Sequence, residues 1–341
     1  MPRPRRRIPL AVILLALMAG ASLVAGCGGG DDDDDGGRDS PVSRPAPAAA
    51  DFPAAQGQSL EQVLGNATGQ GPVVSPAARV LRVGENRFSF GVFTVEREQI
   101  TGAQVAIYAA PKDVQSPAVG PFPARIESLE TEPAFVARST AADPDSGKAV
   151  YVSDVPLDRP GAWTFAALVR EGDGFTGTFV PAPSEVGEFD PVDVGDKAPS
   201  VSTPTADEVA DVAEIDTRVP ASTMHDVDLQ DVLGKKPVVL VFATPALCQS
   251  RICGPVVDVA EQVKRDVEVD GGDVAFIHQE IYVDNDINKG TRPQVNAYRL
   301  PSEPWLYVMD RDGKVSTLIE GAFSVEELQA AVDKVAPAGA S

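Results

Sequence analysis

The sequence has few basic residues, histidines and cysteines, and each shortage argues against a class of function. Its 341 residues carry 29 Lys and Arg against 50 Asp and Glu, a net charge of −21. So acidic a chain is not expected to bind nucleic acid or anionic lipid through a broad basic surface. With 2 histidines and 3 cysteines, it offers few imidazole or thiolate groups for catalysis or metal binding. The hydrophobic content of 43% is nevertheless typical of a globular chain, long enough for two domains.

Residues 1–26 are typical of an export signal. Arginines crowd the start, an apolar run follows over residues 8–19, and small residues lead to Val24-Ala25-Gly26-Cys27. This ending resembles the lipobox of bacterial lipoproteins, which implies cleavage before Cys27 and lipid attachment to it. A retained anchor helix is the alternative, although the run is marginal against the roughly 20 apolar residues that a spanning helix needs. Both interpretations place the remaining chain outside the cytoplasm, attached to a bacterial membrane.

Residues 27–73 predict a tether. Five consecutive aspartates at 31–35 follow three glycines and precede a stretch rich in Pro, Ala and Ser. Such a segment repels itself and has little apolar surface to bury, so we expect an extended chain. Flexible carboxylates also bind calcium weakly, so the tether interpretation is favoured over a calcium site.

Residues 74–183 predict an antiparallel β-sandwich, because short apolar segments alternate with Gly, Pro and Asp. The expected strands are 78–83, 87–95, 103–109, 134–139, 148–153, 162–170 and 174–180, with Gly84-Glu85-Asn86 as a turn. Residues 79–110 and the string Arg159-Pro160-Gly161-Ala162-Trp163 resemble Ig-like domains of bacterial envelope proteins. Some relatives of that architecture bind copper through His and Met, but residues 74–183 contain neither. The resemblance therefore implies an adhesion, spacing or partner-docking module.

Residues 184–222 have little periodicity and predict a linker or an entry segment. From Asp231 onward long apolar segments alternate with amphipathic ones. The apolar run 237–243 is typical of a strand buried on both faces. A helix is expected after it, because apolar residues recur at helical spacing at Val256, Val259, Ala260, Val263 and Val267.

The C-terminal end of the chain predicts a strand, a hairpin and a last helix. The strand is expected over 274–281, and the hairpin over 305–319 around Asp310-Arg311-Asp312-Gly313. Ser324 with Glu327 predicts a capping box at the start of the helix. The residues that this helix should bury are Leu328, Val332 and Val335.

This order of elements in residues 223–341 resembles the thioredoxin fold. The string Val194-Gly195-Asp196-Lys197-Ala198-Pro199 is similar to the entry of the redoxin branch, and residues 236–243 are similar to its central strand. Tyr298-Arg299-Leu300-Pro301-Ser302-Glu303-Pro304 precedes the hairpin as the cis-proline segment does in that family. The expected fold class is multidomain: an all-β Ig-like sandwich followed by an α/β thioredoxin-like fold.

Cys248 and Cys253 fall at the expected strand-to-helix junction, where free N–H groups and the helix dipole stabilise a thiolate. Helical residues five apart have Cα atoms about 8.6 Å apart, whereas a disulfide tolerates roughly 4.4–6.8 Å. The helix is therefore expected to begin near Gly254-Pro255, with both cysteines in the preceding turn; a looped-out segment 249–252 is the alternative. Arg251 either adds to the positive field or is solvated.

The resemblance implies a thiol-disulfide oxidoreductase that acts on envelope protein thiols or disulfides without a cofactor. Cys248 would attack and Cys253 would resolve the mixed disulfide. Pro304 would lie opposite the pair, with the backbone of Glu303 pairing to an incoming peptide. The Glu303 carboxylate should disfavour a thiolate nearby, and Ala246-Leu247 stand where family members often carry Trp. These departures leave the substrate and the redox potential open.

Two alternatives stay open. The SCO-type copper assembly proteins combine a cysteine pair with a histidine on this scaffold, and the copper ligands here would be Cys248, Cys253 and His278, since thiolates and imidazole suit copper. A strand histidine such as His278 is more often packed and hydrogen-bonded, and His225 is expected at the surface. The other alternative is a non-catalytic envelope scaffold with a structural disulfide, although a loop of about six residues contributes only about 2 kcal/mol.

Overall fold

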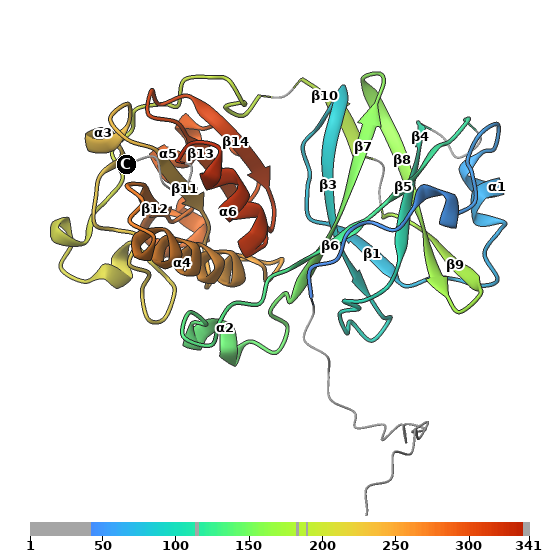
Figure 1. Ribbon diagram of the computed structural model, residues 1–341, viewed down its shortest axis with the longest axis horizontal. Helices are drawn as coiled ribbons and strands as arrows, with labels where there is room; N and C mark the ends of the chain where they lie inside the picture. Colours follow the sequence, from blue (N-terminus) through green and yellow to red (C-terminus); the bar gives the residue numbers. More distant parts are fainter. Residues whose placement is uncertain (1–41, 113–115, 182–183, 189, 337–341) are drawn as a thin grey trace, which may run out of the picture. The chain divides into compact units, whose positions relative to one another are not determined.

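A computed structural model of the chain describes residues 42–112, 116–181, 184–188 and 190–336 (Figure 1). The predicted signal segment, the lipidation residue Cys27 and the aspartates 31–35 lie outside these described residues. All described residues belong to one compact unit. Among them, no helix combines the length and the apolar character needed to cross a membrane.

The N-terminal part of the described chain consists mainly of two β-sheets. One has the strand order β1-β3-β7-β6, and the other has the order β2-β10-β8-β4-β5 with β9 paired to β8. All pairings are antiparallel except that of β2 with β10. The strands are β1 Val73–Pro76, β2 Leu81–Arg82, β3 Gly84–Phe93, β4 Val105–Pro111, β5 Val119–Pro123, β6 Arg125–Ser128, β7 Ala149–Leu157, β8 Gly161–Glu171, β9 Gly174–Phe179 and β10 Ser184–Gly187. The helical segments are η1 Ala49–Asp51, α1 Leu60–Leu64 and α2 Arg138–Ala142.

The two sheets enclose one hydrophobic core between them. Phe88 on β3 stacks on Phe165 on β8 with ring centroids 4.8 Å apart. Phe90 on β3 stacks in turn on Tyr151 on β7, and all four rings are fully buried. The predicted β-rich layered architecture is therefore confirmed.

The tether predicted over residues 27–73 is wrong over residues 42–73, where η1 and α1 form. Phe52, Leu60 and Val63 are buried there, because they pack on the outer face of β4 and β8.

Three further predictions in this part are wrong in detail. Residues 134–139 do not form a strand, because the segment docks on the helix α4 described below and its residues from Arg138 onward form α2. Gly84-Glu85-Asn86 is no turn, since β3 begins at Gly84, which pairs with Leu157 on β7. Residues 184–187, placed in the linker, form β10. The short strands β1, β5 and β6 were not predicted.

The C-terminal part contains a four-stranded sheet of order β12-β11-β13-β14. Strands β11 and β12 are parallel, whereas β11–β13 and β13–β14 are antiparallel. The elements are α3 Leu229–Val232, β11 Val238–Phe242, α4 Cys253–Val269, β12 Ala275–Gln279, α5 Pro293–Ala297, β13 Trp305–Met309, β14 Val315–Glu320 and α6 Val325–Asp333. Short 3-10 turns are η2 Ala206–Glu208, η3 Val212–Glu214, η4 Val283–Asn285 and η5 Ile287–Lys289. The predicted order of strand, helix, strand, hairpin and helix is confirmed.

Strand β11 is buried on both faces, as its uninterrupted apolar run predicts. Val239 and Val241 pack into one core with α4 and α6. Leu240 and Phe242 point to the opposite face, where they pack with Tyr298. The five positions of α4 that recur at helical spacing are likewise buried.

The core of α4 and α6 also receives side chains from the N-terminal part. Leu129 and the β7 residues Val150 and Val152 are buried in it. Tyr151, between the two valines, points into the core between the two sheets. Because side chains alternate along a strand, β7 is buried on both faces.

Glu327 on α6 connects the helix to the first sheet. Its carboxylate accepts hydrogen bonds from Arg87 on β3 at 2.7 Å and from Arg125 on β6 at 2.9 Å. The Ser324 hydroxyl accepts from the Glu327 N–H at 3.1 Å, as an N-cap does. The predicted capping box is therefore only half formed, since the arginines bind the glutamate side chain.

We expect Glu327→Gln to destabilise the chain by about 1–3 kcal/mol at pH 7, the size of a lost charge-assisted hydrogen bond. Burial would raise the pKa of Glu327, but Arg87 and Arg125 lower it below its ordinary value. Because this pKa is lower in the folded chain than in the unfolded chain, the ionised Glu327 stabilises the fold at any pH above the unfolded-chain value of about 4.3. The stabilisation is lost as the pH falls through the folded-chain value. Urea unfolding from pH 3 to pH 7 should therefore show the two chains converging in acid. The exposed neighbour provides the control Glu326→Gln, and a pH-independent difference would contradict the prediction.

Candidate functional site

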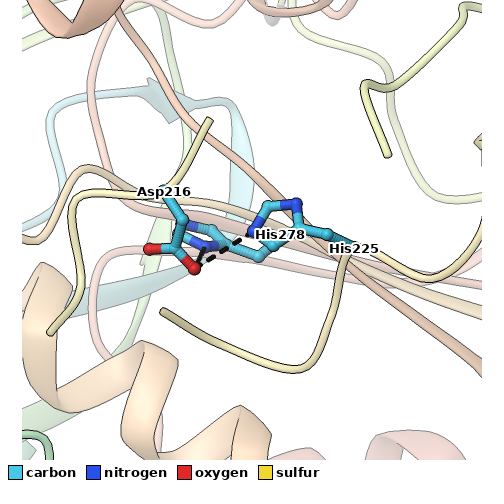
Figure 2. A group of neighbouring side chains, drawn as sticks. All are labelled: Asp216, His225 and His278. Atoms are coloured by element: carbon cyan, nitrogen blue, oxygen red, sulfur yellow. Dashed lines mark hydrogen bonds and ion pairs between the residues drawn. The ribbon is translucent and has the colours of Figure 1, made fainter. Parts of the chain in front are cut away.

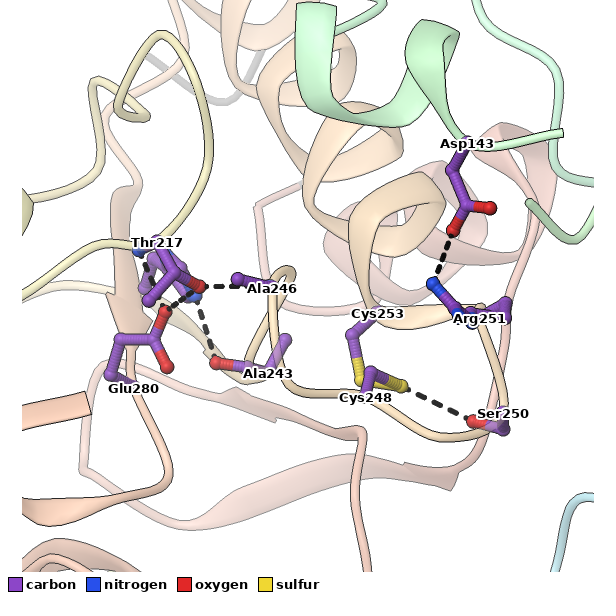
Figure 3. The surroundings of a disulfide bond; sticks show 10 residues. Asp143, Thr217, Ala243, Ala246, Cys248, Ser250, Arg251, Cys253 and Glu280 are labelled. Carbon is purple, nitrogen blue, oxygen red and sulfur yellow. Dashed lines mark hydrogen bonds and ion pairs between the residues drawn. A yellow bond between two sulfur atoms is a disulfide. The ribbon is translucent and has the colours of Figure 1, made fainter. Parts of the chain in front are cut away.

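A disulfide joins Cys248 and Cys253 between the end of β11 and the start of α4 (Figure 3). Their Cα atoms are 5.9 Å apart, within the range that a disulfide tolerates. Cys253 is the first residue of α4, whereas Cys248 lies in the loop before it. The expectation that both cysteines precede the helix is wrong by one residue. The helix can include Pro255 because a first-turn residue needs no N–H donor.

The two sulfur atoms have different surroundings. The Cys248 residue is 6% exposed and Cys253 is fully buried. The Cys248 Sγ lies 3.2 Å from the Ser250 hydroxyl. Both cysteines lie at the N-terminal end of a helix of 17 residues, where the dipole and free N–H groups favour a thiolate.

Residues 129–148, which connect β6 to β7, lie against this loop; we call them the cover segment. Arg251 forms an ion pair with Asp143 at 2.9 Å (Figure 3). The Gly147 N–H donates to the Arg251 carbonyl at 3.0 Å. A Cβ atom on Gly254 would lie only 2.9 Å from the Thr140 hydroxyl, so the cover segment closely approaches the first turn of α4. Arg251 is therefore paired with an acid rather than simply solvated.

A buried ion pair fastens the cover segment to α4. The Arg218 guanidinium donates to Asp258 on α4 at 2.7 Å, and the two side chains are 6% and 2% exposed. Arg218 also donates to the Phe135 carbonyl at 2.6 Å, while the Ala137 N–H donates to Asp258 at 3.1 Å. Burial raises the pKa of Asp258 above its ordinary value, against the lowering effect of Arg218.

A second polar contact orders the loop ahead of Cys248. The Thr217 hydroxyl donates to Glu280 at 2.5 Å and accepts from the Ala246 N–H at 3.0 Å (Figure 3). Glu280 is buried, and its second carboxylate oxygen has no hydrogen-bond partner within the described residues. The Thr217 side chain therefore links the backbone of Ala246, two residues before Cys248, to the buried Glu280 carboxylate.

Both histidines are buried around Asp216 (Figure 2). One Asp216 oxygen lies 3.1 Å from His225 Nε2 and 3.3 Å from His278 Nδ1. The prediction that His225 lies at the surface is wrong, because this buried carboxylate partners its ring. No feature of the sequence indicates that His225 is buried, because its partner Asp216 lies in residues 184–222, which have little periodicity.

Electrostatics and hydrogen bonding shift two of these groups. Burial alone would lower the pKa of His278, but the Asp216 charge and its hydrogen bond raise it to about 8. Burial would raise the pKa of Asp216, but the two histidines and the Arg218 N–H hold it well below its usual range. His278 Nε2 also donates to the Ala243 carbonyl at 3.1 Å. His278 is thus packed and hydrogen-bonded, as expected for a strand histidine.

The predicted cis-proline segment lies at the start of β13. The Glu303–Pro304 peptide bond is cis. Phe242 at the end of β11 pairs with Trp305, so Pro304 lies at the end of the sheet from which the cysteine loop leaves. The Glu303 carboxyl group hydrogen-bonds Tyr282, and burial raises the pKa of Glu303. Of the copper ligands considered, the structure joins Cys248 to Cys253, whereas both His278 nitrogens face Asp216 and Ala243.

No protein-family model and no curated protein matches the chain. Two solved structures from Chlorobium tepidum are similar to it. A protein designated thiol:disulfide interchange protein DsbE is 21% identical, with 42% of this chain and 98% of that chain covered and a TM-score of 0.29. A thiol:disulfide interchange protein of the thioredoxin family is 18% identical, with 44% and 99% covered and a TM-score of 0.27. Likeness at this level assigns neither a family nor an activity to the chain.

Proposed function

We propose that the chain is an extracytoplasmic thiol-disulfide oxidoreductase whose thioredoxin-like C-terminal part reacts through Cys248 and Cys253. One observation carries the proposal: the disulfide joins a loop residue to the first residue of the 17-residue helix α4. That position stabilises a thiolate, the reactive form in disulfide exchange. The strand order around β11 and the position of Pro304 also support a thioredoxin-like site.

The exchange balances without a cofactor. In the reduced protein the Cys248 thiolate attacks one sulfur of a substrate disulfide, forming a mixed disulfide and releasing one substrate thiolate. The Cys253 thiolate then attacks the Cys248 sulfur, which releases the second substrate thiolate and forms the Cys248–Cys253 disulfide. Two electrons pass to the substrate, and the reverse steps oxidise a dithiol. Cys248 is assigned the attack because it is the less buried cysteine.

The substrates are proposed to be envelope proteins. The backbone of Glu303 would pair with the substrate chain next to Pro304, while the lipid on Cys27 would hold the protein at a bacterial membrane. The sheets of the N-terminal part would serve as an Ig-like spacing or docking module. The lipid assignment rests on the sequence Val24-Ala25-Gly26-Cys27 alone.

The cover segment favours a second candidate, an envelope scaffold with a structural disulfide. It contacts Arg251 and Gly254, and Cys248 is only 6% exposed. An exchange enzyme must let a substrate sulfur reach Cys248, so these contacts have to open during turnover. In a scaffold they would stay closed.

Equilibration with glutathione separates the two candidates. For an oxidoreductase we expect a reduction potential above about −300 mV and a detectable mixed disulfide with glutathione, because structural disulfides fall below that value. Alkylation of free thiols followed by mass spectrometry measures both quantities. A potential below about −300 mV without a mixed disulfide would support the scaffold instead.

A further inference from the structure

Asp216, His225 and His278 bring three possible metal-donor atoms close together. One atom from each residue, two ring nitrogens and a carboxylate oxygen, lies within 4.8 Å of the others (Figure 2). Bonds of about 2.0–2.2 Å to zinc at tetrahedral angles place donor atoms about 3.3–3.6 Å apart, and at right angles about 3.0 Å apart. The distances of 3.1 and 3.3 Å from Asp216 to the two rings match that spacing.

The surroundings orient the donors as the outer contacts of a metal site do. His278 Nε2 donates to the Ala243 carbonyl at 3.1 Å, which turns Nδ1 toward Asp216. The other Asp216 oxygen accepts from the Arg218 N–H at 2.8 Å. The Ser222 hydroxyl lies 3.4 Å from His278 Nδ1, and the Ser222 N–H donates at 2.6 Å to the Asp216 oxygen that faces both histidines. The remaining His225 nitrogen is buried without a hydrogen-bond partner in the part of the chain described.

Charge balance points the same way. Asp216 belongs to the cluster, and the charge of the buried Glu280 acts on His278. The buried Arg218 is already paired with Asp258. As metal ligands the two histidines would be neutral, which leaves the negative charges of Asp216 and Glu280 for a bound ion to balance. Buried charges are costly unless they are paired or coordinate a metal. A divalent ion supplies the missing charge.

We propose that Asp216, His225 and His278 bind a first-row divalent metal ion, of which Zn²⁺ fits the donor set best. Two imidazoles and a carboxylate are ligands that Zn²⁺ accepts. The site is separate from the cysteine pair and is structural. It fastens residues 216–225 to β12, and the same segment provides Thr217, which holds the loop ahead of Cys248.

Zinc binding to the full chain in its disulfide form tests the proposal. After treatment with a chelator, the protein is titrated with Zn²⁺ in competition with a fluorescent indicator, and Co²⁺ serves as a spectroscopic probe. We expect one Zn²⁺ per chain and a rise in melting temperature. Asp216→Asn and His225→Gln should each weaken binding about 100-fold or more, since even outer-contact changes cost 10–100-fold. Circular dichroism confirms that the variants are folded.

Two controls make the outcome decisive. Asp226→Asn changes an exposed carboxylate next to His225 and should leave binding unchanged. The double variant Cys248→Ser/Cys253→Ser should also keep its affinity, and Co²⁺ should show no thiolate charge-transfer band. Loss of binding in the cysteine variant would overturn the ligand set. So would a folded wild-type chain that binds no Zn²⁺ and gains no thermal stability. The wild-type measurements decide even if the variants do not fold.

Discussion

A Cys253→Ser chain is expected to accumulate a covalent complex with a substrate. After Cys248 attacks, no second thiolate remains to release the mixed disulfide, so the intermediate persists. Non-reducing electrophoresis of the reduced variant, incubated with a disulfide-containing model protein such as insulin, should show a band that disappears on adding dithiothreitol. Turnover in an insulin-reduction assay should fall by roughly 10³-fold or more, as losses of a reacting group commonly do.

The matched variant is Cys248→Ser, which should lose turnover equally but trap nothing, because the fully buried Cys253 cannot reach the substrate. Trapping by Cys248→Ser and not by Cys253→Ser would reverse the assigned roles. Wild-type turnover equal to that of both variants would remove the redox proposal and leave the disulfide as a staple. None of these outcomes depends on Asp216, His225 or His278, so the metal proposal stands or falls separately.

Arg218→Met is expected to destabilise the chain by about 3–5 kcal/mol, the cost of leaving a buried carboxylate without its partner. Asp258 would lose the guanidinium 2.7 Å away, and the Phe135 carbonyl would lose a donor. The methionine keeps much of the side-chain volume, so lost packing contributes little. Urea unfolding followed by tryptophan fluorescence measures the change.

Arg159→Met is the matched control, because Arg159 pairs with Asp158 at 2.8 Å but on the surface. It should leave stability unchanged within error. The double variant Arg218→Met/Asp258→Leu should recover much of the loss, since replacing both buried partners removes the unpaired charge. An equal effect of Arg218→Met and Arg159→Met would show that the buried pair adds nothing.

The C-terminal elements could be predicted because the way each one is buried determines the spacing of its apolar residues in the sequence. A strand covered on both faces needs an uninterrupted apolar run, and residues 237–243 supply one that becomes β11. The helix α4 buries one stripe, and Val256, Val259 and Val263 mark it at helical spacing. The cysteine spacing likewise limited where the helix could begin, to within one residue.

The wrong predictions concern segments whose structure is determined by contacts with residues far along the chain. Residues 134–139 are rich in apolar side chains, but Arg218 and Asp258, far along the chain, bind their backbone. The sequence around His225 predicts a surface residue, but His225 is buried with its ring against Asp216. Polar contact partners do not recur with the period of a helix or a strand. The sequence pattern therefore could not predict the Asp216 cluster.

Strand β7 has a consequence for how the chain unfolds. Its residue Tyr151 belongs to the core between the two sheets, whereas Val150 and Val152 belong to the core of α4 and α6. Burying a valine is worth about 1.5–3 kcal/mol, so separating the two cores exposes apolar surface on the same strand. Loss of either core therefore weakens the other. We therefore expect the cysteine loop and the two N-terminal sheets to unfold in one cooperative transition, because α4 packs on the side chains of β7.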